Sequence, residues 1–219
     1  MWNSQVIIML LEGIRDTLYM TLASTLFGYI IGLPMGIVLT VTDKDGIRPN
    51  AAVYKVLDVS SNLLRSIPFI ILLIVLIPFT RFVVGRSYGS TATIVPLTIA
   101  AAPYIARMVE SSLKEVDAGV IEAARSMGAS DFQIVTKVML VEARTSLIVG
   151  ATISLGTILG YSAMAGTVGG GGLGDIAIRY GYTRWQTDIM VVTVVLLVIL
   201  FQIFQTIGMK IANRLDRRK

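Results

Sequence analysis

Long apolar stretches run through most of the chain, separated by shorter polar ones. A bilayer core about 30 Å thick is crossed by about 20 mostly apolar residues in helical form. Five segments meet this requirement, at residues 17–41, 59–77, 91–108, 147–168 and 189–209. The pattern therefore predicts an all-α membrane protein with five transmembrane helices. Prolines and glycines interrupt several of them, which favours either kinked helices along a moving pathway or close helix packing.

The composition agrees with a membrane protein. Of the 219 residues, 54% are apolar and 15% are charged, whereas soluble domains carry about 25% charged residues. Cysteine and histidine are absent, which excludes disulfides, thiolate metal sites and imidazole acid–base chemistry. The net charge of +5 is better explained by cytoplasmic loops than by nucleic-acid binding.

The basic residues are unevenly distributed between the two sides of the predicted spans. Fourteen of the 19 lysines and arginines lie in the loops 42–58, 109–146 and 210–219 or beside them, and five lie on the other side. The positive-inside rule then places the C-terminus in the cytoplasm and the N-terminus outside. We expect a multi-pass protein of the cytoplasmic membrane, with the segment 110–145 inside the cell.

This segment has the local signals of two short helices joined by a sharp turn. Asp117 is a suitable N-cap, and Gly128 can end the first helix in the left-handed conformation. Ser130 and Gln133 form a capping box that starts the second helix. We expect one apolar stripe along that helix, formed by Phe132, Val135, Val138 and Met139.

The first of these helices has small and charged residues on its surface. Glu122 and Arg125 are spaced to form an ion pair, and Ala123 and Ala124 allow another surface to approach closely. Such a helix pair can insert into a groove on a partner protein. Alternatively, it can rest in the lipid interface as an amphipathic pair.

The motif E-A-A-x-x-x-G at residues 122–128 resembles the EAA motif of ABC importer permeases. Val141 departs from this motif, because the family usually has proline there. Further segments resemble the methionine importer permeases, and together they extend the likeness from about residue 13 to 208. These segments are NLLRSIPFIILL (62–73), IPFTR (77–81), IVPLT (94–98), AAPYIARMVE (101–110) and GYSAMAG (160–166).

The resemblance implies a type I ABC importer permease fold, with one transmembrane domain at 13–208 and a basic cytoplasmic tail at 209–219. It implies a homodimer that carries no catalytic site and binds no metal or cofactor itself. ATP and Mg²⁺ would be bound by a dimer of ABC ATPase subunits. An extracytoplasmic binding protein would deliver methionine, in the L- and D-forms. The residues expected to contact the ATPase are Glu122, Ala123, Ala124, Arg125, Met127, Gly128 and Ala129.

Candidate pathway residues lie near glycines and prolines of the predicted spans. Met164 is a candidate gate because its flexible thioether can close a narrow pore, and the resembling permeases have methionine there. Tyr161 and Ser162 adjoin it on the same helix. Ser66 and Pro68 lie where the proline frees a backbone carbonyl. Plain helix packing is the alternative for each of these residues.

The glycine run VGGGGLGDIAIRYGY, residues 168–182, permits other interpretations. It matches a dinucleotide fingerprint, but that motif requires a preceding strand. It also matches the GxGD motif of intramembrane aspartyl proteases, which need a second carboxylate nearby. We favour an external loop with an aromatic belt, which in the resembling family meets the binding protein. Two other interpretations are a permease for another small amino acid and an ion-coupled transporter. Ion-coupled transporters usually carry an acidic residue in the middle of a span, and none of the predicted spans has one.

Overall fold

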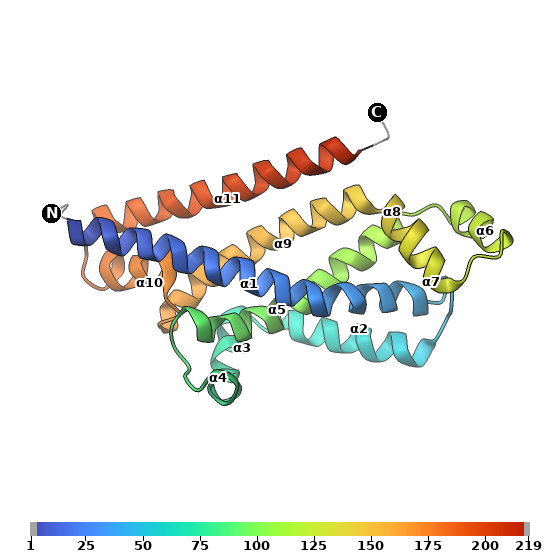
Figure 1. The fold of residues 1–219 in the computed structure, drawn as a ribbon. Coiled ribbons are helices and arrows are strands. Elements are labelled where there is room, and N and C mark those ends of the chain that lie inside the picture. The colour runs from blue at the N-terminus through green and yellow to red at the C-terminus, as the bar shows by residue number, and fades with distance from the viewer. Residues whose placement is uncertain (1–3, 217–219) are drawn as a thin grey trace. The chain divides into compact units, whose positions relative to one another are not determined.

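A computed structural model describes residues 4–216, and this part of the chain folds into helices throughout (Figure 1). The last three residues of the predicted tail lie outside it. The first five helices are α1 (Ser4–Thr42), α2 (Ala51–Ser66), α3 (Phe69–Val75), α4 (Ile77–Val84) and α5 (Ser90–Lys114). Next come α6 (Ala118–Ser126), α7 (Asp131–Gln133), the π-helix η1 (Ile134–Met139) and α8 (Leu140–Glu142). The chain ends with α9 (Arg144–Ala165), the 3₁₀ turn η2 (Gly166–Val168), α10 (Gly172–Ile176), the π-helix η3 (Ala177–Tyr182) and α11 (Thr187–Leu215).

Within residues 4–216, four helical segments are long and apolar enough to cross a membrane, and α2 with α3 counts as a fifth only if the bent pair is one span. The predicted span at 59–77 is therefore two separate helices, with the interruption at Pro68. Pro68 causes the break, because its ring disfavours the helical conformation at the preceding residue. Pro68 itself has φ −55° and ψ 134°, which are extended values. The segment continues as α3 only from Phe69.

The long helices extend beyond the predicted spans. The 39 residues of α1 amount to about 58 Å of helix, well over the thickness of a bilayer core. The helix α11 continues to Leu215 without interruption at 208–209, where the tail was predicted to start. Large apolar side chains on both helices are exposed, including Leu26 at 60% and Val191 at 55%. An apolar exterior of this kind is expected of a surface that faces lipid or another membrane helix.

The described residues form two compact units. The first contains residues 4–27, 67–101 and 155–205. Its apolar core includes Leu10, Leu173, Ile176 and Ile189. The Thr17 hydroxyl accepts a hydrogen bond from the backbone N–H of Leu173 at 2.9 Å, so α1 holds the beginning of α10 through a polar contact inside an apolar core.

The backbones of α9 and α10 cross very closely in this unit. A Cβ atom at Gly174 would lie 2.1 Å from the carbonyl oxygen of Ala163, and one at Gly166 would lie 2.2 Å from the backbone N of Asp175. Both distances are far below van der Waals contact. Glycine is therefore required at both positions for the two segments to pack.

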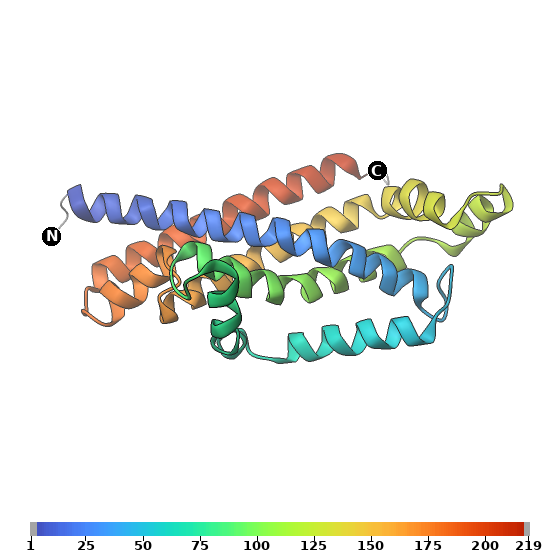
Figure 2. The ribbon, with the colours of Figure 1, turned by 60° about the horizontal axis from the view of Figure 1, so that its bottom comes forward.

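The second unit contains residues 28–66, 102–154 and 206–216. It includes α2, α6, α7, η1, α8 and the adjoining parts of α1, α5, α9 and α11. Within this unit, α6 and the turn that follows it project at one end, as Figures 1 and 2 both show. This projecting pair is the segment for which the sequence predicted a partner-binding role.

Candidate functional site

The predicted helix–turn–helix forms, and hydrogen bonds account for its sharp turn. Asp117 caps α6, and its carboxylate accepts from the N–H of Gly119 at 2.8 Å. At the other end the N–H of Ala129 donates to Ala124 O at 3.1 Å and the N–H of Gly128 to Arg125 O at 3.0 Å. These two bonds define a Schellman motif, and the φ of +79° at Gly128 explains why the motif has glycine there.

The second helix begins as predicted but continues differently. Ser130 and Gln133 form the capping box, with the Ser130 N–H donating to Gln133 Oε1 at 2.9 Å. Residues 134–139 then wind as a π-helix, so the apolar spacing is wider than in an α-helix. The predicted stripe is wrong at Phe132, which is 77% exposed, and Ile134 is fully buried instead.

Most of the residues predicted to contact an ATPase are accessible. Glu122, Ala123, Arg125, Met127 and Gly128 are exposed, and Met127 reaches 82%. The other two are less accessible: Ala129 is half-buried, and Ala124 is buried at the Schellman turn. The projecting pair therefore presents charged, small and flexible apolar groups on one continuous turn.

The predicted ion pair between Glu122 and Arg125 does not form in the described part of the chain. The Arg125 guanidinium instead donates to the carbonyl oxygen of Ile47 at 2.7 Å. This carbonyl belongs to the loop between α1 and α2, 78 positions earlier in the sequence. Spacing along one helix could not reveal such a distant acceptor.

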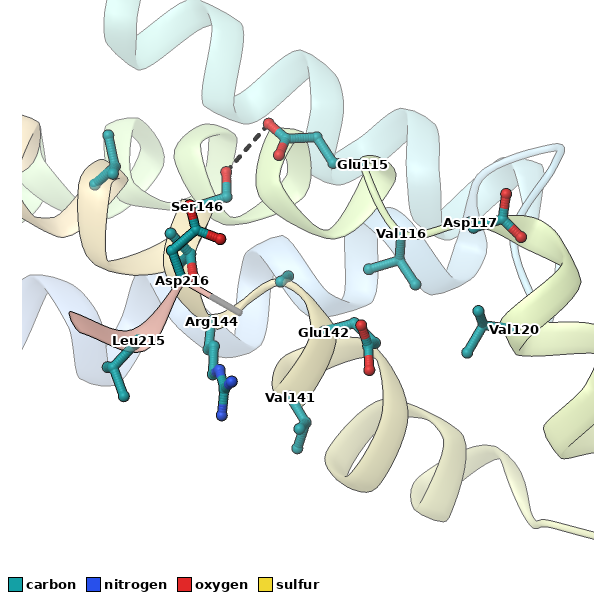
Figure 3. A pocket seen from close by; sticks show the side chains of 13 residues that line it. Glu115, Val116, Asp117, Val120, Val141, Glu142, Arg144, Ser146, Leu215 and Asp216 are labelled. Atoms are coloured by element: carbon teal, nitrogen blue, oxygen red, sulfur yellow. Dashed lines mark hydrogen bonds between the residues drawn. The ribbon is translucent and has the colours of Figure 1, made fainter. Parts of the chain in front are cut away.

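A recess of about 400 Å³ lies next to the beginning of α6, and Figure 3 shows the side chains that line it. Four carboxylates and one guanidinium line it, from Glu115, Asp117, Glu142, Asp216 and Arg144. Glu115 accepts a hydrogen bond from the Ser146 hydroxyl at 3.1 Å. The lining residues come from three separate stretches of the chain, within 115–120, 141–149 and 215–216, and sequence analysis did not single out the recess.

The candidate pathway residues fall in both units. Tyr161, Ser162, Met164 and Pro68 belong to the first unit, and Ser66 belongs to the second. Met164 is 46% exposed. Ser162 is buried, and its hydroxyl donates to Leu159 O at 2.8 Å within its own helix. The Ser66 hydroxyl likewise donates to Asn62 O at 2.7 Å.

One aromatic contact near Met164 was missed by the sequence analysis. The rings of Phe69 and Tyr161 stack with centroids 4.6 Å apart and an interplanar angle of 5°. Phe69 is the first residue of α3, directly after Pro68, and is itself buried. The proline break therefore presents an aromatic ring to the segment that carries Met164. A phenylalanine directly after an intramembrane proline was the available sequence signal.

The glycine run has a structural role that fits neither alternative motif. It follows the helix α9 and the turn η2 instead of a strand, which removes the context that a dinucleotide fingerprint needs. Asp175 pairs with Arg179 at 2.9 Å, so its carboxylate faces a cation. Gly174 provides the close crossing with α9, and Gly171, with φ +84°, lies directly before α10.

Comparisons with known proteins agree with this arrangement. The family described as "Binding-protein-dependent transport system inner membrane component" matches residues 19–219. A Vibrio cholerae protein named "Probable D-methionine transport system permease protein MetI" is 48% identical over 210 residues, covering 96% of this chain and 93% of that protein. The Escherichia coli (strain K12) protein named "D-methionine transport system permease protein MetI" is 54% identical over 158 residues, covering 72% of this chain and 73% of that protein.

Solved structures show the same fold. A chain described under "Inward facing conformations of the MetNI methionine ABC transporter" superposes with a TM-score of 0.97 and 49% identity, covering 99% of this chain and all of that chain. An amino acid ABC transporter matches with a TM-score of 0.78 at 19% identity, covering 96% of this chain and 95% of that one, and shares the fold alone.

The fold and the matched sequence define a class of all-helical inner-membrane transport components. The chain belongs to the family of binding-protein-dependent transport system inner membrane components. Within this family it is similar over nearly its whole length to proteins named as D-methionine permeases. The predicted family resemblance is confirmed.

Proposed function

We propose that this chain is the membrane-spanning permease subunit of an ABC importer for methionine, driven by ATP hydrolysis in a partner subunit. One observation carries the proposal: 99% of this chain superposes on a chain of the MetNI methionine transporter at 49% identity with a TM-score of 0.97. The relatives named as D-methionine permeases support uptake of the D-form, and we propose uptake of the L-form beside it.

In the proposed arrangement α2 and α3 act as one broken span, so the subunit crosses the membrane five times. The N-terminus lies outside and the C-terminus in the cytoplasm, as the distribution of basic residues favours. Five spans are few to enclose a path for a solute. A symmetric pair of subunits supplies ten spans around a shared axis, and the exposed apolar faces of α1 and α11 leave surface for lipid and for the second copy.

Each α6 docks on one subunit of an ABC ATPase dimer, which binds ATP and Mg²⁺. The residues that make the contact are Glu122, Ala123, Ala124, Arg125, Met127, Gly128 and Ala129. The projection of this helix pair and the exposure of Met127 support the assignment. The chain contains no G-x-x-x-x-G-K-[ST] sequence, which is the loop that holds nucleotide phosphates in P-loop ATPases.

The segment 168–182 meets the extracytoplasmic binding protein, and Met164 closes the path between the two copies. Tyr161 and the ring of Phe69 stacked on it hold the gate-bearing segment in place. Closure of the ATPase dimer on ATP moves α6 and rocks the spans as rigid bodies. Hydrolysis then resets the assembly.

Uptake of labelled L-methionine into proteoliposomes tests the proposal. The vesicles contain this chain, its ATPase and its binding protein, and ATP is supplied on the cytoplasmic side or withheld. We expect ATP-dependent accumulation that excess unlabelled D- or L-methionine suppresses. If ATP is hydrolysed without methionine uptake and a different amino acid is taken up instead, the class of transporter stands and methionine is not its substrate. Uptake that follows an ion gradient and needs no ATP would contradict the proposed class.

A further inference from the structure

Five charged side chains form a continuous cluster at the cytoplasmic end of α5. Arg107, Glu110 and Lys114 lie on α5, Asp58 lies on α2 and Asp43 lies directly after α1. Arg107 pairs with Glu110 at 2.7 Å and also pairs with Asp58. Lys114 pairs with Glu110 at 2.9 Å and with Asp43 at 2.6 Å. The cluster thus links three segments that are distant in sequence.

Glu110 is the centre of this charge cluster. Its side chain is only 6% exposed, and its carboxylate forms ion pairs with both Arg107 and Lys114. The Tyr54 hydroxyl on α2 donates a third, longer hydrogen bond to it at 3.4 Å. Taking charges out of water costs several kcal/mol per ion, and the attraction between the buried partners offsets this cost only in good geometry. If these positions served helix packing alone, apolar residues would stabilise the helices equally well. A paired cluster of this kind points to a requirement for a defined geometry.

The loop that carries Asp43 is itself a stiff body. Backbone hydrogen bonds close it from Gly46 to Asp43 at 3.0 Å, from Arg48 to Val41 at 3.0 Å and from Asn50 to Thr42 at 2.9 Å. A Cβ at Gly46 would lie 2.4 Å from Val41 O, which shows how tightly the loop is folded. A force on any point of this loop is therefore passed to Asp43.

The projecting helix holds the same loop. The Arg125 guanidinium of α6 donates to Ile47 O at 2.7 Å. A cavity of about 570 Å³ separates much of α6 from the loop and the end of α5, so this hydrogen bond is a discrete polar link across an open space. The contacts run without a gap from α6 to the loop, from the loop to α5 through Lys114, and from α5 to α2 through Arg107.

From these contacts we infer that the charge cluster is a positioning relay, which transmits movement of α6 through the loop 43–50 to α5 and α2. The inference rests on the proposed function, because it assumes that α6 is driven by an ATPase. The residues act on transport through other residues and touch neither substrate nor nucleotide. Loss of the Asp43–Lys114 link should leave the ATPase bound and active while uncoupling it from the spans.

The test compares two aspartates of the same loop. Asp43→Asn removes the carboxylate that pairs with Lys114. Asp45→Asn removes an 82% exposed carboxylate whose ion pair among the described residues is with the exposed Lys44 at 3.7 Å. For each variant one measures co-purification with the ATPase, ATP hydrolysis stimulated by the binding protein with methionine, and methionine imported per ATP in proteoliposomes. Asp43→Glu, which keeps the charge, is the rescue variant.

We expect Asp43→Asn to assemble normally and to hydrolyse ATP within about twofold of the original rate, with import per ATP reduced at least about fivefold, the lower range of typical coupling effects. Asp45→Asn should match the original chain, and Asp43→Glu should recover most of the loss. An import ratio equal to that of Asp45→Asn would overturn the relay, as would loss of the ATPase subunit. If Asp43→Asn does not fold, the same measurement of methionine imported per ATP is made on Asp58→Asn, at the α2 end of the cluster, and its result decides whether the relay exists. Absence of methionine uptake by the original chain would instead refute the proposed function.

Discussion

The crossing of α9 and α10 permits a stringent test of the packing. Substituting Gly174 by alanine places a methyl group 2.1 Å from the carbonyl oxygen of Ala163 and 2.6 Å from its Cα. Both atoms belong to the backbone of α9, so no side-chain rotation can relieve the overlap. The two segments must separate by more than about 1 Å to restore ordinary contact, and overpacking of this kind typically costs about 1–3 kcal/mol.

The matched control is Gly150→Ala in α9, where the new Cβ would lie 3.4 Å from Met108 Cβ, an ordinary contact. This change should be neutral or slightly stabilising, because alanine favours helix more than glycine does. Thermal unfolding of the two purified variants in detergent measures the difference. For a chain of this size, each kcal/mol of destabilisation lowers Tm by about 2–4 °C. We therefore expect Gly174→Ala, and not Gly150→Ala, to lower Tm clearly. A Tm within about 1 °C of the original would refute the packing argument.

Three further predictions concern the coupling segment, the aromatic stack and pH. Gly128→Asp should abolish co-purification with the ATPase while membrane insertion stays intact. Gly128→Asn should co-purify with more of the ATPase than Gly128→Asp does, because asparagine tolerates the left-handed conformation. Equal amounts of ATPase retained by the two variants would contradict the role of Gly128 in docking. Phe69→Ala removes the stack on Tyr161 and should destabilise the chain by about 3–5 kcal/mol, measured by thermal unfolding, with Phe69→Leu losing less; equal losses would contradict the stacking argument. The hydrogen bond from Lys114 lowers the pKa of Asp43 below its ordinary 3.8, so the stability from this pair is present above that value and lost only in more acidic solution. Import per ATP should therefore show no Asp43-dependent change between about pH 6 and about pH 8, and a titration removed by Asp43→Asn would contradict this.

Local signals predicted the projecting helix pair well because its geometry depends on nearby residues. An N-cap, a left-handed glycine and a capping box each act within a few positions, and Asp117, Gly128 and Ser130 all have the predicted conformations. The exposed face of the pair follows from these three residues together with the alanines between them. This part of the candidate site was therefore readable from the sequence.

The contacts that join distant segments could not be predicted in the same way. Helical spacing suggested Glu122 as the partner of Arg125, but a folded loop far away in the sequence supplies a carbonyl acceptor. The charge cluster likewise draws on three segments, so no spacing rule connects Asp43 with Lys114. Pro68 signalled an interruption of the apolar run at 59–77, but hydropathy could not show that two separate helices form there, because it measures composition and not backbone conformation.

The π-helix η1 accommodates one residue more than an α-helix of the same rotation would hold. Its backbone hydrogen bonds span one residue more than those of an α-helix, so each residue turns the chain by a smaller angle. Deleting one residue between Ile134 and Met139 would let the segment rewind as an α-helix, and five α-helical residues turn the chain by about as much as these six π-helical ones do. The exposed face of α6 would then keep nearly the same direction relative to α8, whereas the same deletion within a regular α-helix would turn one side by about 100° relative to the other. We therefore expect a one-residue deletion to be tolerated in this stretch during evolution, as in the glycine-bounded turn at 85–89, where added Cβ atoms at both glycines meet no neighbour.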